Sequence, residues 1–303
     1  MEKTPLLQML RRHRAFASLS LTLLATVSAC VETSETNEAA SNSNLVSDEA
    51  LAPRLLQDLE QTAAFVAAFS AQDYEIAEVP ELGRFYIDDN PAWVKRELKE
   101  GRPWEPSTQV VMTTHTRAGT TALDIGAHIG SHSVTLSHLV GPEGAVYSFE
   151  PQRKIYRELV MNLELNKLEN VIPLRFAIGA ENKLVEMTPT SNFDGRMFVG
   201  KGGDGVELRT IDSFGFSNVS IMKIDVEGFE LEVLKGAVET IATWHPAIVI
   251  EITGFYQYDR MPPNGKKLVD DVLAFFERMN YEFKFIEYAG EPHFLALHVP
   301  PTS

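Results

Sequence analysis

Short apolar runs alternate with helix-length segments from residue 122 onward, and this pattern predicts the core of the fold. The predicted strands span 122–123, 145–149, 171–178, 220–224 and 247–252. The predicted helices between them span 131–140, 153–168 and 229–244. Such alternation is typical of βαβ units, in which helices cover both faces of a mostly parallel sheet. The pattern therefore predicts an α/β fold.

Segments on either side of this core complete the predicted organisation. The runs 281–286 and 294–299, joined by a short turn with Gly290, are predicted to form a C-terminal antiparallel hairpin. Before the core, apolar residues recur at near-helical spacing from residue 55 to 69. A further helix is expected at 91–100, because proline at a first helical position is favourable. We therefore expect an N-terminal helical extension at 51–118 and an α/β domain at 119–303.

The first 30 residues have the features of a targeting segment. Arg11, Arg12 and Arg14 precede an uncharged stretch, 15–29, that ends at Cys30. This stretch is shorter than the roughly 20 residues that span a bilayer, but it suits a signal-peptide core. The sequence Val-Ser-Ala-Cys at 27–30 resembles a bacterial lipobox, in which the cysteine becomes lipidated. We therefore expect a lipoprotein-like signal peptide at 1–29 and a lipid anchor at Cys30.

The segment 30–50 is expected to be a disordered tether. It carries acidic residues and no basic residue among Ser, Asn, Thr and Ala, so it has little apolar surface to bury. Val31 stands where an aspartate would suggest retention in the inner membrane, so the resemblance favours the outer membrane. The alternative is a misassigned start, for example at Met9, and an ordinary cytoplasmic protein.

Composition excludes several classes of function. The chain has 303 residues, 27 Lys and Arg against 42 Asp and Glu, and a net charge of −15. This acidic balance argues against a nucleic-acid partner, which would require a basic surface. The single cysteine excludes an intramolecular disulfide and metal sites built from several thiolates. Composition does not indicate what the protein binds.

The first candidate site follows the strand at 122–123. Asp124 precedes a loop with Gly126 and Gly130, and a helix begins directly after it. Glycine permits a tight turn and close approach to a ligand, and a helix N-terminus offers amides to an anion. The middle glycine of the dinucleotide motif G-x-G-x-x-G is missing, so an NAD-linked oxidoreductase is disfavoured.

A second acidic residue makes this loop more specific. Glu150 ends the next strand, where an acid can accept the hydroxyls of a ribose. Asp124 could receive the amino group of a cofactor that carries an amino acid. Two acids around a glycine turn suit S-adenosylmethionine better than an anionic pyrophosphate. Alternatively, each acid could simply cap loop amides at a strand end.

Five motifs of the chain together resemble the FkbM-type methyltransferases, which have the Rossmann-like class I fold and depend on S-adenosylmethionine. They are Asp124 to Gly130, Phe149 to Pro151, the pair Asn162 and Asn166, Ala177, and Lys223 to Glu230. The resemblance extends from about Trp104 and Glu105 to the final hairpin. The cofactor-binding residues that it implies are Asp124, Gly126, Ala127, His128, Gly130, Glu150 and Ala177. His128 departs from the family, which usually has asparagine there, and this could weaken the cofactor contact.

By the same resemblance, the segment 223–230 faces the methyl group and the acceptor. A hydroxyl must lose its proton as it attacks, and Asp225 and Glu227 are the candidate catalytic bases. Alternatively, these acids could occupy a helix N-terminus only because the helix dipole favours anions there. Lys223 is expected to be structural or to orient the substrate. The expected function is O-methylation of a small-molecule hydroxyl, on a sugar, a polyketide or a related metabolite.

Three further hypotheses concern a metal, a specificity loop and the absence of activity. His128 and His132 with Asp225 or Glu227 could hold a metal, but no ligand-spacing motif supports this, so no metal is expected. The segment 255–263 is the first candidate for acceptor specificity. The alternative function is a membrane-tethered binding or scaffold protein with this fold and no activity, because an exported domain would be separated from cytoplasmic S-adenosylmethionine.

Overall fold

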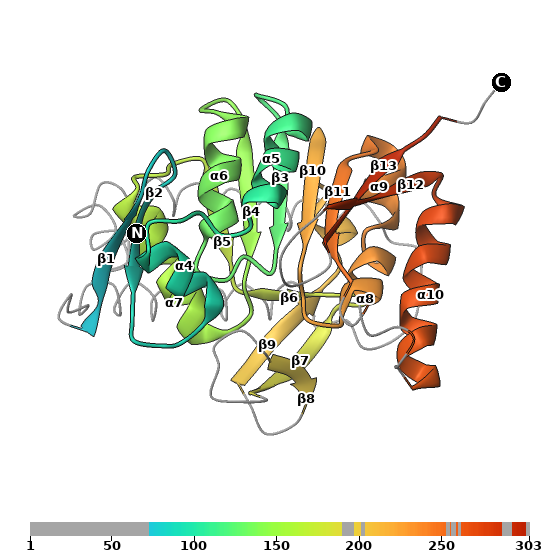
Figure 1. Cartoon of the computed structure of the whole chain (residues 1–303). Coiled ribbons are helices and arrows are strands. Elements are labelled where there is room, and N and C mark those ends of the chain that lie inside the picture. The colour runs from blue at the N-terminus through green and yellow to red at the C-terminus, as the bar shows by residue number, and fades with distance from the viewer. Residues whose placement is uncertain are drawn as a thin grey trace, which may run out of the picture.

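The computed structural model describes residues 73–189, 197–200, 204–252, 255, 259, 262–286 and 293–300 (Figure 1). The predicted signal peptide, the anchor Cys30, the tether and the helix predicted at 55–69 lie outside these residues, as do most of the predicted specificity loop and the turn with Gly290. Within the described residues, no helix combines the length and apolarity needed to cross a bilayer.

In the described part of the chain, a central sheet has the strand order β12-β13-β11-β10-β3-β4-β5. The strands are β3 (Thr121–Ile125), β4 (Ala145–Phe149), β5 (Val171–Leu174), β10 (Val219–Ile224), β11 (Ala247–Glu251), β12 (Tyr281–Ile286) and β13 (His293–His298). All neighbouring pairs from β5 to β11 are parallel, and β13 runs antiparallel to β11 and β12. The chain leaves β3 toward β5 and returns to the other side of β3 as β10, so the switch point lies between β3 and β10. Ligands of open α/β sheets bind at the carboxyl ends of the strands there.

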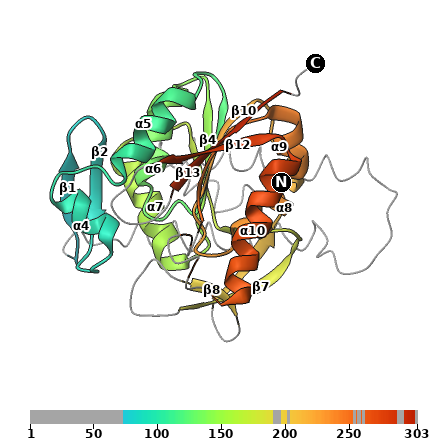
Figure 2. The same ribbon diagram turned by 45° about the vertical axis from the view of Figure 1, so that its right-hand side comes forward.

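Helices cover both faces of this sheet (Figures 1 and 2). One face packs against α5 (Pro106–His115), α6 (Ser131–Val140) and α7 (Arg153–Leu165), and the other against α8 (Glu230–Lys235), α9 (Val238–Trp244) and α10 (Pro263–Arg278). Side chains of neighbouring strand residues point to opposite faces of the sheet. Ala122 belongs to the apolar cluster with α5, α6 and α7, and Leu123 to the cluster with α8, α9 and α10. This arrangement confirms the predicted α/β, class I methyltransferase fold with a C-terminal antiparallel hairpin.

Two predicted elements are each divided in the structure. The run at 171–178 forms β5 and then β6 (Phe176–Ile178), which belongs to a second sheet of order β6-β9-β7-β8 with β7 (Lys183–Pro189), β8 (Met197–Gly200) and β9 (Asp204–Arg209). The helix predicted at 229–244 is broken into α8 and α9 at Gly236, where a Cβ would lie 1.9 Å from the Gly179 carbonyl oxygen. The chain segment after β6 therefore approaches the break too closely for a continuous helix with side chains. A short 3-10 helix, η2 (Asp212–Phe214), precedes β10.

The N-terminal extension predicted as helical at 51–118 contains strands as well as helices in its described part. An antiparallel hairpin of β1 (Glu75–Val79) and β2 (Gly83–Ile87) precedes α4 (Trp93–Lys99), which confirms the helix predicted at 91–100, and α5. Alternating residues of the hairpin, such as Phe85 and Ile87, are buried against α4 and α7. Each strand has only five residues, so the alternation of apolar and polar positions is too short to be recognised in the sequence beside the longer helical patterns.

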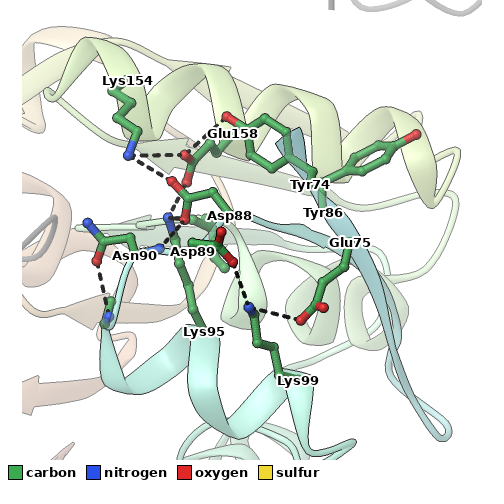
Figure 3. A network of polar contacts seen from close by, with 12 residues as sticks. Tyr74, Glu75, Tyr86, Asp88, Asp89, Asn90, Lys95, Lys99, Lys154 and Glu158 are labelled. Atoms are coloured by element: carbon green, nitrogen blue, oxygen red, sulfur yellow. Dashed lines mark hydrogen bonds and ion pairs between the residues drawn. The ribbon is translucent and has the colours of Figure 1, made fainter. Parts of the chain in front are cut away.

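A buried ion cluster fastens this extension to α7 (Figure 3). The ammonium of Lys95 on α4 is fully buried and lies 2.6 Å from Asp88 Oδ1 and 2.8 Å from Glu158 Oε2 on α7. Lys154 on α7 also contacts Asp88, at 2.8 Å. Burial alone would raise the pKa of Asp88, but these two lysines lower it to about 2. The extension is therefore an integral part of the domain.

The paired asparagines of α7 attach to the open edge of β2. Asn162 accepts a hydrogen bond from the Tyr86 amide (2.7 Å) and donates one to the Ile129 carbonyl (2.9 Å). Asn166 accepts from the Arg84 amide (2.9 Å) and donates to the Arg84 carbonyl (2.6 Å). Because the side chain of Asn162 reaches both β2 and the glycine loop, it couples the extension to the candidate site.

Candidate active site

The glycine loop after β3 packs directly on the chain leaving β10. The amides of Gly126 and Ala127 both donate to the Phe149 carbonyl, at 3.0 and 2.9 Å. The Asp225 amide donates to the Ile125 carbonyl at 3.0 Å. Gly126 has φ +82°, and a Cβ there would lie 1.8 Å from the Asp225 carbonyl oxygen. Glycine is therefore required, and the structure brings the two predicted motifs into contact.

The end of the loop is shaped by His128 and Gly130. His128 has a left-handed backbone (φ +49°), and its amide donates to Glu150 Oε2 at 3.0 Å. Gly130 caps α6 with φ +92°, and a Cβ there would lie 2.7 Å from the Leu159 side chain of α7. Gly130 thus allows α6 to pack closely on α7, while the buried Ala127 lies within the loop. The left-handed conformation favours the asparagine that the family usually has at position 128, because asparagine tolerates it well.

Glu150 is a buried carboxyl group at the end of β4. It is 4% exposed and accepts hydrogen bonds from the amides of His128 and Gln152, at 3.0 and 2.9 Å. Burial raises its pKa to about 7, against the effect of these two amides and of Lys223. The carboxylate does cap loop amides, as the simpler interpretation expected. Each oxygen has a second lone pair, so it can also accept a hydroxyl of a ligand.

Asp124 and Lys223 form a second buried group beneath the loop. Asp124 is fully buried, and its Oδ2 accepts a hydrogen bond from Ser133 Oγ at 2.6 Å. Its Oδ1 has no hydrogen-bond partner among the described residues, and the Lys223 ammonium lies 3.8 Å away. That ammonium donates to the Gly126 carbonyl (2.8 Å) and pairs with Asp225 Oδ2 (3.1 Å). Lys223 therefore links the two loops.

The two predicted catalytic acids differ in environment. Burial would raise the pKa of Asp225, but Lys223, a side-chain hydrogen bond with Glu251 and His293 together hold it well below its usual range. Glu227 is half-buried in the tight turn before α8, with a left-handed backbone (φ +53°). Asp225 is thus held ionised by fixed partners, which makes it a weak base.

Ala177 lies in β6, apart from this hydrogen-bond network. It is buried in the apolar cluster of the second sheet, where its neighbours include Leu208 and Phe229. Phe229 follows the segment 223–228, so this cluster adjoins the turn that carries the candidate acids. The structure therefore places Ala177 beside the site through apolar packing.

The structure adds residues that sequence reasoning did not select. Glu105, at the start of α5, is 2% exposed, and its Oε2 lies 3.0 Å from His132 Nε2 and 3.3 Å from His293 Nε2. One potential ligand atom from each of Glu105, Asp225 and His293 lies within 4.8 Å of the others. The interpretation that pairs His128 with His132 does not match this geometry, because the His132 ring contacts Glu105. The family resemblance begins near Glu105, but no local pattern marks His293.

A sheet of this order, with an acid-flanked glycine loop at its switch point, defines a class I methyltransferase. A family model described as the methyltransferase FkbM domain matches residues 124–283. The chain belongs to the FkbM methyltransferase family.

Similar proteins were found among curated sequences and solved structures. The hexuronic acid methyltransferase AglP of Haloferax volcanii is 29% identical over 135 residues, which are 42% of this chain and 53% of that protein. The chain thus spans about half the length of this curated relative. The crystal structure of methyltransferase FkbM from Methylobacillus flagellatus KT has a TM-score of 0.44 and 16% identity, with 80% of this chain and 60% of that chain covered. SMU.1697c from Streptococcus mutans, solved with SAH, has a TM-score of 0.41 and 14% identity, with 65% and 98% covered.

Proposed function

We propose that this protein is an S-adenosylmethionine-dependent methyltransferase that acts on a hydroxyl oxygen of a sugar, a polyketide or a related small molecule. The observation that carries the proposal is the close packing of the Gly126 loop on Asp225, with Glu150 beside it. This contact joins the predicted cofactor loop to the predicted acceptor side at the switch point of the sheet. Family membership supports methyl transfer as the reaction class.

The residues around the loop suit the cofactor. Glu150 offers two carboxylate oxygens to the ribose hydroxyls, and Asp124 Oδ1 is a buried acceptor that an amino group could satisfy. Gly130 begins α6, whose N-terminal amides could bind the cofactor carboxylate. Because the cofactor carries a sulfonium charge, these buried acids also favour it electrostatically.

When bound, S-adenosylmethionine supplies an electrophilic methyl group. The acceptor oxygen forms the new bond to the methyl carbon as the bond from that carbon to sulfur breaks, and the hydroxyl proton must pass to a base. Glu227 and Asp225 are the carboxylates at this end of β10. Lys223 holds Asp225 in a fixed position, so Asp225 is suited to orienting the acceptor. Alignment of acceptor and methyl carbon supplies much of the acceleration in such displacements.

Two observations support the proposed acceptor class, the charge around the site and the relative. The name of the Haloferax protein describes a hexuronic acid methyltransferase, which supports a sugar-like acceptor. In this chain, the carboxyl groups of Glu105 and Glu251 are buried and that of Asp225 is mostly buried, and without a bound cation they would repel an anionic acceptor. A neutral hydroxyl is therefore favoured over a carboxylate.

The test begins with calorimetric titration of S-adenosylmethionine into the full-length chain. Asp124→Ala and Glu150→Ala should each weaken binding about tenfold or more while the fold is retained, because each removes a hydrogen bond to a charged group. No binding to the folded protein at millimolar cofactor would contradict the proposal. Asp225→Asn and Glu227→Gln should bind the cofactor and lose methyl transfer to a metabolite extract, followed with a labelled methyl group.

We also propose, from the sequence alone, that Cys30 anchors the protein to a bacterial envelope membrane. Cys30→Ser should release the protein from the membrane fraction, and mass spectrometry of the wild type should find an acyl chain. An unmodified Cys30 with unchanged fractionation would favour the cytoplasmic alternative. A purified protein that binds S-adenosylmethionine without any turnover would instead favour the tethered binding protein.

A further inference from the structure

A buried group of acids and histidines lies beside the predicted acceptor position. Its members are Glu105 at the start of α5, His132 on α6, Asp225 after β10, Glu251 at the end of β11 and His293 at the start of β13. Glu251 and His293 are direct partners in the pairing of β11 with β13. We name these five residues the acid–histidine cluster.

We propose that Glu105, Asp225 and His293 of this cluster bind a divalent cation of the manganese or magnesium type. Binding of the cation is independent of the proposed function, but its catalytic role rests on that function.

The geometry of the three side chains is close to that of a cation site. One ligand atom from each lies within 4.8 Å of the others. In an octahedral ion with bonds of about 2.1 Å, adjacent ligands are about 3.0 Å apart and opposite ligands about 4.2 Å apart. Glu105 Oε2 and His293 Nε2, which are 3.3 Å apart, already match adjacent ligands, and the Asp225 carboxylate would approach them by at most about 2 Å. The three side chains come from the residue before α5, the residue after β10 and the first residue of β13. They are therefore positioned by the fold and are not neighbours in the sequence.

The balance of charge points to a cation. Glu105, Asp124, Asp225 and Glu251 are buried or mostly buried carboxyl groups, and Lys223 is the amine that pairs with two of them. Asp225 and Glu251 are in hydrogen-bond contact with each other. Two carboxyl groups in contact need either a proton or a cation between them, because like charges in a buried site are costly. A divalent cation, the sulfonium of the cofactor and the Lys223 ammonium would together balance the four carboxylates.

The surroundings of the ligands suit a metal centre. His132 Nε2 holds the Glu105 carboxylate at 3.0 Å, and the Lys223 ammonium holds Asp225 at 3.1 Å. Outer contacts of this kind orient the ligands of metal sites. Glu105 and His293 are almost fully buried, so they are already desolvated. The two carboxylates favour a hard cation such as Mn²⁺ or Mg²⁺, and the imidazole of His293 is the one ligand of these three that also suits Zn²⁺ or Fe²⁺.

A cation at this position would supply the activation that Asp225 cannot. The Lys223 ammonium lies 3.1 Å from Asp225 Oδ2 and holds this carboxylate in the position of a ligand. A hydroxyl bound to a divalent cation has a lowered pKa and ionises more readily. The cation would thus prepare the acceptor, and Glu227 is the carboxylate that would take the proton.

The test is a titration of Mn²⁺ into the chelator-treated full-length chain, with free Mn²⁺ followed by electron paramagnetic resonance. We expect saturable binding of about one equivalent, reversed by excess Mg²⁺. His293→Ala and Glu105→Gln should each weaken binding by at least about tenfold, since loss of outer-shell partners alone has effects of that size. The matched controls His138→Ala and Glu143→Gln, at exposed positions, should leave it unchanged.

Two results would overturn the cation site. One is the absence of Mn²⁺ binding to the wild-type protein at millimolar concentration, with and without S-adenosylmethionine. The other is binding that neither cluster variant weakens. A parallel titration of S-adenosylmethionine into the metal-free protein separates the two proposals. Cofactor binding without Mn²⁺ binding refutes the cation site alone, whereas Mn²⁺ binding without cofactor binding refutes the proposed function alone.

Discussion

Glu150→Gln tests whether burial of the Glu150 carboxyl group controls both stability and cofactor binding. Burial raises the pKa of this group from 4.5 to about 7. A pKa difference of about 2.5 corresponds to about 3 kcal/mol. The charge of Lys223 lowers the pKa of Glu150 and the charge of Asp124 raises it. The pKa of Lys223 is itself raised, so Lys223 keeps its charge throughout the pH range of the experiment.

The sign of the pH dependence follows from proton binding. Between pH 4.5 and about 7 the folded protein keeps a proton on Glu150 that the unfolded chain has lost. The free energy of unfolding therefore falls as the pH rises through this window, and it stays lowered above it. Glutamine resembles the protonated carboxyl group at every pH. The advantage of the variant over the wild type should therefore grow by about 2 to 3 kcal/mol between roughly pH 5 and 8.5.

Urea unfolding of both proteins at these two pH values measures that change, and Glu143→Gln on an exposed turn is the control. Any constant cost of placing the glutamine amide near a backbone amide cancels in the comparison. The same variant should bind S-adenosylmethionine about 10 to 100 times more weakly, because a hydrogen bond to a charged group contributes about 1.5 to 3 kcal/mol. A stability difference that does not depend on pH would refute the reasoning from burial.

Three further substitutions test the loop and the extension. Gly126→Ala should lower stability by about 2 to 5 kcal/mol through left-handed strain and a clash with backbone, whereas Gly141→Ala, in open space, should cost about 1 to 2 kcal/mol, both measured by thermal unfolding. Asn162→Ala should cost about 2 to 4 kcal/mol in urea unfolding, because a partly buried amide and a buried carbonyl lose their partner, and a change under about 1 kcal/mol would contradict this. Lys95→Met should cost about 3 to 5 kcal/mol by leaving two carboxylates without their shared ammonium, and a neutral effect would show that the ion cluster is dispensable.

The sequence by itself determined the elements whose signals are local. The strand 145–149 and the helix 131–140 were predicted with the bounds that the structure has, because their periods and the glycines around them are local features. The glycine loop with Asp124 and Glu150 was likewise predictable, since a turn between a strand and a helix depends on nearby residues. The alternation of strands with helices also predicted the mostly parallel sheet, and with it the edge of the sheet at which Asp124 and Glu150 meet.

Only the tertiary structure decided which distant groups meet and how they titrate. The break at Gly236 depends on the approach of the segment after β6, which no local pattern contains. Glu105 and His293 come together only because α5 and β13 converge on the end of β10. The raised pKa of Glu150 and the lowered pKa of Asp225 arise from burial and from neighbours far apart in sequence. Such effects depend on distance and solvent exclusion in space, and these are set by the packing of the whole chain.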